Sequence, residues 1–138
     1  MNTKIFTTLP QEAKDIRIEV FMKEQGFENE FDDIDNISFH IVVFDEEKPI
    51  GTCRFFKEND HYTIGRGAVL KEYRNQHIGN VLLESAEKEI KKLNGALIVV
   101  HAQVRVSPFY ENQGYIQFGQ IDDDEGVPHM WMKKRIQH

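Results

Sequence analysis

Residues 67–83 read GAVLKEYRNQHIGNVLL, and they contain the transition from a strand to a helix. The first residues of this stretch end a run, 62–70, whose composition is typical of a strand. A short polar loop follows, and from Ile78 to Leu93 apolar residues recur at helical spacing. The stretch therefore predicts a strand, a loop and a long amphipathic helix.

Other expected elements flank this transition, and their order indicates the fold class. Strands are expected at residues 5–7, 38–44, 50–57, 62–70, 96–100, 115–118 and 129–132. Helices are expected from a cap at Thr7 or Thr8 to a stop at Gly26, over 78–93, and over 108–113. The acidic segment 28–35 is expected as a loop or a short exposed helix, and 122–126 as a polar loop. The order β-α-β-β-β-α-β-α-β-β predicts an α/β fold, with a mixed sheet of six to seven strands and about four helices on both faces.

Length and composition are typical of one globular domain, which we expect to span 1–138. The net charge of −6 comes without a basic stripe, so no nucleic-acid partner is expected. No apolar run approaches the roughly 20 residues that cross a bilayer, so no membrane partner is expected either. Met1–Phe6 lacks the apolar region of a signal peptide and Cys53 is the single cysteine, which together predict a cytoplasmic protein. The histidines show no metal-ligand spacing, so no metal is expected, and a homodimer remains open.

The start of the helix near Ile78 is the first candidate site. The first amides of a helix have no intrahelical acceptor and, with the helix dipole, they attract a phosphate-like anion. Gly79 allows such an anion close to the backbone, and Arg74 adds a charge-assisted contact. An ordinary strand–helix connection explains the same pattern equally well.

The loop and helix start resemble the acetyl-CoA motif of the GNAT superfamily, Gln/Arg-x-x-Gly-x-Gly/Ala. The motif is represented here by Arg74-x-x-His77-x-Gly79, so a histidine replaces its first glycine. Histidine tolerates a positive φ better than most residues with a Cβ, so we expect the loop geometry to be retained.

Two further blocks agree with this resemblance. Residues 108–115, Pro-Phe-Tyr-Glu-Asn-Gln-Gly-Tyr, are similar to the superfamily signature Phe-Tyr-Glu-Lys-Leu-Gly-Phe. The N-terminal residues 17–26, followed by 32–35 and His40, resemble the ElaA/YjcF-like branch of small bacterial GNAT proteins. The three blocks stand in the family's order and span most of the chain.

The resemblance implies an acetyl-CoA-dependent N-acetyltransferase that moves an acetyl group to a primary amine of a small molecule or peptide by direct attack. It also implies a set of residues that bind the acetyl-CoA co-substrate: Gly67, Ala68, Val69, Arg74, Asn75, Gln76, His77, Ile78, Gly79, Asn80, Gln103 and Tyr110. Two alternatives remain: a non-catalytic acyl-CoA-binding sensor on the same fold, and an amino-sugar phosphate N-acetyltransferase. The second requires a basic acceptor pocket, which Arg17, Arg54, Arg66 and Arg105 would form if they converged.

By the same resemblance, Tyr110 is the general acid that protonates the departing CoA thiolate. Its phenol, with a pKa of about 10, is a plausible donor to a thiolate. The alternative is that Tyr110 only packs against its aromatic neighbours. No strand expected near the thioester carries a carboxylate, so the base stays open between His101, His40 and a water-bridged acid, either Glu24 or one of 28–35. Proton loss to water is the default expectation.

The two acidic segments, 28–35 and 122–125, are expected beside the acceptor. They favour a cationic amine if they face it, although solvated loops explain them as well. Cys53 is expected to be a buried, inert thiol.

Overall fold

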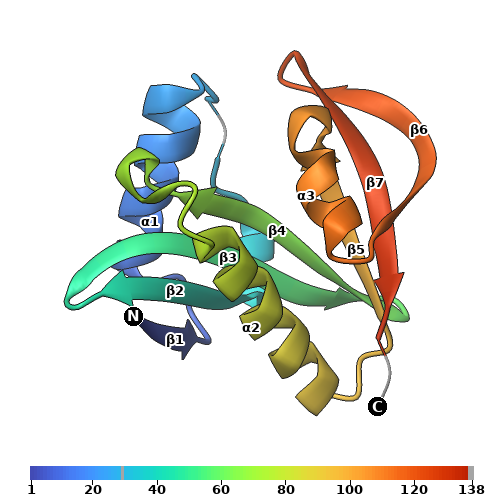
Figure 1. The fold of residues 1–138 in the computed structure, drawn as a ribbon, viewed down its shortest axis with the longest axis horizontal. Helices are drawn as coiled ribbons and strands as arrows, with labels where there is room; N and C mark the ends of the chain where they lie inside the picture. The colour runs from blue at the N-terminus through green and yellow to red at the C-terminus, as the bar shows by residue number, and fades with distance from the viewer. Residues whose placement is uncertain (29, 137–138) are drawn as a thin grey trace.

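The computed structural model describes residues 1–28 and 30–136 and contains one seven-stranded sheet with the order β1-β2-β3-β4-β5-β7-β6. All neighbouring strands run antiparallel except β4 and β5, which are parallel. Parallel neighbours need a crossover, and the long helix α2 provides it. In Figure 1, β5–β7 and α3 lie on one side of the molecule, and β1–β4 with α1 and α2 lie on the other.

The elements follow the expected order, and the fold class is confirmed. The strands are β1 (Asn2–Phe6), β2 (Phe39–Asp45), β3 (Lys48–Glu58), β4 (His61–Val69), β5 (Leu97–Gln103), β6 (Ile116–Asp124) and β7 (Val127–Arg135). The α-helices are α1 (Gln11–Arg17), α2 (Ile78–Lys92) and α3 (Ser107–Asn112). Shorter helical segments are the π-helix η1 (Ile18–Glu24), which extends α1, and the 3₁₀ turns η2 (Asp33–Ile37), η3 (Lys71–Tyr73) and η4 (Val104–Val106).

The prediction of a polar loop at 122–126 is wrong for most of these residues. Asp122, Asp123 and Asp124 are paired with β7, so only Glu125 and Gly126 turn the chain. Their φ values of +51° and +80° suit a tight turn between two antiparallel strands. Pairing across the sheet therefore overrides the turn propensity of the acidic run.

The two faces of the sheet carry separate cores because side chains alternate along a strand. Ile41 and Val43 of β2 belong to the cluster that packs under α2, with Leu82 and Ile90 among its members. Val42, on the same strand, belongs to the cluster with α1 and η1 on the opposite face. Helices therefore cover both faces, as expected.

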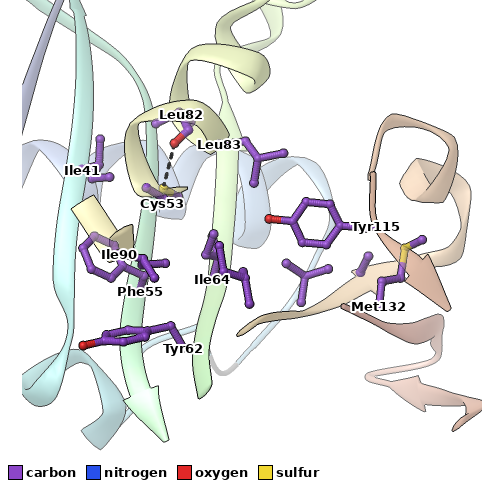
Figure 2. Packing of buried hydrophobic residues seen from close by; sticks show 14 of the residues in the cluster. Ile41, Cys53, Phe55, Tyr62, Ile64, Leu82, Leu83, Ile90, Tyr115 and Met132 are labelled. Atoms are coloured by element: carbon purple, nitrogen blue, oxygen red, sulfur yellow. Dashed lines mark hydrogen bonds between the residues drawn. The ribbon is translucent and has the colours of Figure 1, made fainter. Parts of the chain in front are cut away.

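Close contact between α2 and β3 sets the position of the helix start. A Cβ on Gly51 would lie 2.9 Å from Ile78 Cγ2 and 3.2 Å from Leu82 Cδ1, so the first turns of α2 rest directly on this glycine. Figure 2 shows Cys53 on the same strand with its sulfur directed toward α2, where Sγ lies 4.0 Å from the Leu82 carbonyl oxygen. Burial raises the pKa of the Cys53 thiol to about 12, so the expected inert thiol is found.

Across the described residues, none of the helices combines the length and apolar composition that crossing a membrane requires.

Candidate active site

The sheet opens between β4 and β5. The parallel pairing covers only three residues of each strand and ends at Ile64 opposite Val100. Beyond this pair the strands separate, and two cavities, one on each side of the opening, share Ile64, Gly67, Val106 and Tyr110 in their linings. A ligand in one cavity therefore lies next to a ligand in the other at this opening.

A β-bulge places backbone groups at the opening. Thr52 pairs with Ala68 and Arg54 with Gly65, so Arg66 and Gly67 together oppose one residue of β3. Arg66 has a φ of +52°, which is uncommon for a residue with a Cβ. Gly67 has no residue opposite it on β5, because the β4–β5 pairing has already ended, and it lines both cavities. The bulge therefore brings Gly67 to the opening between the two cavities.

The first cavity has a volume of about 580 Å³ and lies at the N-terminus of α2. Ten of the residues predicted to bind acetyl-CoA line it: Gly67, Ala68, Val69, Arg74, Asn75, His77, Ile78, Gly79, Asn80 and Tyr110. Within the described residues, the backbone N–H groups of 75–80 donate to no protein acceptor, and the first bond of the helix is Val81 N–H to the His77 carbonyl, at 3.1 Å. Six unpaired amides at a helix N-terminus form a site for an anion.

Two residues of the motif loop, Asn75 and His77, adopt a positive φ. His77 has φ +64° and ψ +19°, and Asn75 also has a φ of +64°. A left-handed residue followed by a helical one turns successive N–H groups toward one side, which creates a concave anion site. The expectation that His77 adopts a positive φ is confirmed.

Arg74 does not point freely into the cavity. Its guanidinium makes two hydrogen bonds to Glu24 of η1, at 2.6 and 2.7 Å, and its Nε donates to the Val69 carbonyl at 3.0 Å. The hydrogen bond from Arg74 lowers the pKa of the Glu24 carboxyl. Glu24, a candidate base in the sequence, is therefore a fixed anion that ties η1 to the loop before α2.

The surroundings of Tyr110 in α3 fit both hypotheses made from the sequence, a general acid and a residue that packs against its aromatic neighbours. Its ring makes edge contacts with Phe109 and Tyr115, at centroid distances of 5.1 and 5.6 Å, and it also lines both cavities. Burial, followed by the nearby Cys53 thiol, raises the pKa of the Tyr110 phenol to about 12. The phenol is therefore protonated at neutral pH and is available as a proton donor.

The second cavity, of about 140 Å³, lies on the face that α1 and η1 cover. Phe21 and Phe27 contribute apolar surface, and polar groups come from both halves of the sheet. The charged and histidine residues of its lining are Glu30, Arg66, His101, Arg105, Asp124, Glu125 and His129. Gln103, predicted to bind the co-substrate, lies here and not in the first cavity, and it is bonded to Gln25 and Arg105. Gln76, also predicted to bind the co-substrate, lines neither cavity.

The expected arginine cluster exists, but carboxylates neutralise it. Arg17 binds Glu30 at 3.1 Å and Asp35 at 2.8 Å, and it is 1% exposed. Arg54 binds Asp35 at 2.9 Å, and Arg66 binds Glu30 at 2.9 Å, while both also bind Asp32. The three arginines are therefore paired with three carboxylates, and the alternative of solvated acids at 28–35 does not hold for the buried Glu30 and Asp35. Of the four arginines considered for a basic pocket, Arg105 alone stands outside this cluster.

The pKa values of two carboxyls in this cluster are shifted in opposite directions, because burial dominates at Glu30 and hydrogen bonds from arginines dominate at Asp35. Burial raises the pKa of Glu30 to about 7, although Arg66 and Arg17 oppose the shift. The pKa of Asp35 is lowered to about 2, because hydrogen bonds from Arg17 and Arg54 outweigh its burial. Glu30, which lines the second cavity, is thus a candidate base from the 28–35 segment.

His40 is excluded as a base by its position. Its Nε2 lies 3.0 Å from the Asp35 carbonyl oxygen, it is buried, and it lines neither cavity. Burial lowers its pKa. His40 therefore has a structural role beside the arginine cluster.

His101 lies in the second cavity with two ring neighbours. Its Nε2 is 2.7 Å from Asp122 Oδ1, and its ring stacks on Trp131 at 4.3 Å and lies 4.8 Å from the ring of His129. The sequence prediction placed Asp122 beside the acceptor only as part of the acidic segment 122–125, and it did not include His129 among the candidate site residues. The alternation of His129 and Trp131 along a strand was the available signal, because it puts both on the face that carries His101. Among the described residues, no group of three or more His, Cys, Asp or Glu residues has a geometry that could hold a metal ion.

The sequence and the fold both match known proteins. The family model described as acetyltransferase (GNAT) domain matches residues 8–136. The uncharacterized N-acetyltransferase YjcF of Bacillus subtilis is 35% identical over 122 residues, which cover 86% of this chain and 87% of YjcF. The ElaA protein of Escherichia coli is 23% identical over 128 residues, which cover 88% of this chain and 84% of ElaA.

Solved structures extend the likeness to the whole fold. The crystal structure of E. coli ElaA superposes with a TM-score of 0.86 and covers 96% of this chain and 98% of its own. An acyl-CoA N-acyltransferase from Pseudomonas aeruginosa gives a TM-score of 0.86 at 18% identity, with the same coverage. An aminoglycoside 6′-N-acetyltransferase in complex with coenzyme A gives a TM-score of 0.80 at 15% identity and covers 100% of this chain and 99% of its own. At these identities the likeness concerns the fold.

Proposed function

Because the chain belongs to the GNAT acetyltransferase family, we propose that it transfers an acetyl group from acetyl-CoA to a primary amine of a small molecule or peptide by direct attack. The observation that carries this proposal is the row of unpaired amides 75–80, which opens into a cavity that ends at Tyr110 and at the gap between β4 and β5. The coenzyme A complex of a protein with the same fold supports the choice of co-substrate. A cytoplasmic location is part of the proposal.

Acetyl-CoA supplies an acetyl group activated as a thioester. The amides of 75–80 hold its diphosphate, and Arg74, fixed by Glu24, keeps their loop in place. Gly67, at the bulge, offers a backbone N–H to the negative charge that develops on the thioester carbonyl oxygen. The second cavity receives the amine from the opposite side of the gap, so the two reactants approach through the opening.

Tyr110 donates its proton to the sulfur as the carbon–sulfur bond breaks. An acid is most effective when its pKa is close to that of the group that it protonates. Burial raises the pKa of the Tyr110 phenol to about 12, so the phenol keeps its proton until a strongly basic group, such as a desolvated thiolate, forms beside it.

His101 accepts the proton that the amine loses, directly or through one water, because it lines the acceptor cavity together with Gly67 and Tyr110. Glu30 is the second candidate base. The cavity volume of about 140 Å³ accommodates the amine-bearing end of an acceptor, and the rest of a larger molecule extends outside. Asp124 and Glu125 in the lining favour a cationic acceptor.

The test is thiol release from acetyl-CoA over a panel of cationic and neutral primary amines, together with Tyr110→Phe. We expect turnover with a subset of amines, and a loss of at least tenfold in kcat for the variant with an unchanged Kd for CoA, because the phenol oxygen acts on the leaving group only. Glu111→Gln on the same short helix is the control, since Glu111 lines neither cavity. CoA binding without turnover on any amine would refute the catalytic proposal. Equal rates for Tyr110→Phe and wild type would remove Tyr110 as the acid.

A further inference from the structure

A row of side chains crosses three strands on the acceptor side of the sheet. His101 of β5 pairs with Trp131 of β7, and Gln103 pairs with His129, so the side chains of these four residues share one face. His129 in turn pairs with Asp122 of β6. His101 reaches diagonally over β7 to Asp122, and Trp131 forms the surface on which its ring stacks, at 4.3 Å.

An irregularity in β6 brings Asp122 to this row. Phe118 pairs with Trp131 and Asp122 pairs with His129. The chain therefore advances four residues on β6 where it advances only two on β7, so β6 contains two additional residues. Gly119, with a φ of +73°, lies within the additional length. Bulges of this kind redirect a side chain beside a functional site. On a regular β6 strand the residue opposite His129 would be Gln120.

The hydrogen bond to Asp122 defines which nitrogen of His101 is free. A carboxylate only accepts, so Nε2 of His101 carries a proton and donates it to Asp122 Oδ1 at 2.7 Å. Nδ1 of the neutral ring then keeps its lone pair. His101 also lowers the pKa of the Asp122 carboxyl, so this residue is ionised at neutral pH. Asp122 thus selects the tautomer of His101 and stabilises its imidazolium form, and Trp131 limits rotation of the ring.

We propose that Asp122 is a positioning residue of the acetyl transfer, which orients His101 so that its Nδ1 takes the amine proton, and this inference rests on the proposed function. The bond from the amine nitrogen to the acetyl carbon forms as the carbon–sulfur bond breaks, and the amine proton passes to His101 Nδ1. Tyr110 gives its proton to the sulfur. Water in the connected cavities then returns the proton from His101 to the Tyr110 phenolate, so both residues regain their starting state.

Other titratable groups near His101 must be separated from it in a test. They come from each element around the second cavity: Asp122 and Asp124 of β6, His129 of β7, Arg66 of β4, Arg105 of η4, Tyr110 of α3, and Glu30 and Glu125. His129 has Nδ1 2.8 Å from the Val127 carbonyl, so that nitrogen carries its proton. Glu30 is the strongest competitor for the role of base, because burial raises its pKa to about 7.

The experiment compares Asp122→Asn, Asp123→Asn and Glu30→Gln. Asp123 is the matched control, since it is the next residue on the same strand, is exposed and lines neither cavity. The pH profile of kcat/KM is measured for one amine, and the His101 ring is followed by NMR titration in the free protein. Thermal melting of each variant and the Asp122→Glu variant check that the fold is retained.

For Asp122→Asn we expect the acidic limb of the profile and the NMR signals of the His101 ring to change together relative to Asp123→Asn, because the neutral amide no longer fixes the proton on His101 Nε2. The maximal kcat falls at least tenfold, Asp122→Glu restores part of it, and KM for acetyl-CoA is unchanged. A purely structural role would lower activity without changing either the acidic limb or the His101 ring signals.

Three results would overturn the inference. The first is an Asp122→Asn profile that coincides with that of Asp123→Asn, the second is a set of His101 ring signals that does not change, and the third is an acidic limb that disappears in Glu30→Gln. A wild-type protein without turnover on any amine would refute the proposed function itself, and a catalytic role for Asp122 with it. Wild-type turnover together with an unchanged pH profile in Asp122→Asn would refute the role of Asp122 and leave the proposed function intact.

Discussion

Substitution of Gly79 by aspartate is expected to weaken anion binding at the start of α2 without lowering the stability of the fold. Gly79 lies in the first turn of α2, and a Cβ there would meet only the Phe109 ring, at 3.5 and 3.6 Å, which is ordinary van der Waals contact. Glycine in a helix costs up to about 1 kcal/mol relative to better helix formers, and a carboxylate in the first turn gains about 0.3–1 kcal/mol from the helix dipole. Gly79→Asp is therefore expected to melt at the wild-type temperature or a few degrees above it.

The same carboxylate opposes co-substrate binding. Gly79 lines the first cavity beside the unpaired amides, so the new charge lies next to the place of the diphosphate. Two unit charges about 5 Å apart repel by about 3 kcal/mol at an effective dielectric constant of about 20. A loss of about 3 kcal/mol corresponds to a Kd for CoA that is at least 100-fold higher. Stability and binding thus respond in opposite directions.

Calorimetric titration with CoA and thermal melting measure the two effects. Gly79→Ala is the steric control, because it adds the Cβ without the charge, and the family motif accepts alanine at this position. Lys88→Glu is the charge control, since Lys88 is exposed and lies in the second half of the same helix, away from the first cavity. If Gly79→Asp bound CoA within threefold of Gly79→Ala, the amides at the start of α2 would not be the diphosphate site.

Two further predictions concern the buried ion cluster. Arg17→Met leaves Asp35 paired with Arg54 alone and Glu30 paired with Arg66 alone. Breaking a buried ion pair costs about 3 kcal/mol, which lowers Tm by about 10 °C at an unfolding entropy of about 2.1 cal/mol/K per residue. Scanning calorimetry measures this change in Tm, and a fall below 2 °C would refute a structural role for the cluster. The pKa of Asp35 is lowered to about 2 in the folded protein, so ionised Asp35 stabilises the folded state by about 2 kcal/mol. This stabilisation is complete above the pKa of an unfolded aspartate, near 3.9, and is lost as the pH falls toward 2. Urea unfolding should therefore show a shallower loss between pH 4 and 2 in Asp35→Asn than in wild type, and parallel curves would contradict this assignment. The contribution of Glu30 to stability changes with pH in the opposite direction. Because the pKa of Glu30 is raised in the folded protein, stability falls as the pH rises from 4.5 to about 7.

Local patterns of the sequence were sufficient for the element order and for the anion loop. Period-two and helical spacing depend on neighbours within one turn or one strand, so residues 62–93 could be assigned as strand, loop and helix. The positive φ of His77 was expected from the intrinsic tolerance of histidine. The resemblance to the GNAT motif gave the family, which the comparisons confirm.

The acceptor side could not be assigned in the same way, because its contacts join residues far apart in the chain. Arg17 and Asp35 are 18 residues apart, and His101 and Asp122 are 21 apart. A run of acids is compatible with solvation or with ion pairing, and only packing brings the guanidinium groups that decide between them.

The sequence by itself determined the order of the strands and helices, because their spacing patterns depend on short-range geometry, and its resemblance to the GNAT motif indicated the family. The tertiary structure alone decided that Gln103 lies in the second cavity, that Glu30, Asp32 and Asp35 are paired with arginines, and that Asp122 meets His101. The reason is the sheet order β5-β7-β6, which brings together residues that are far apart in the chain.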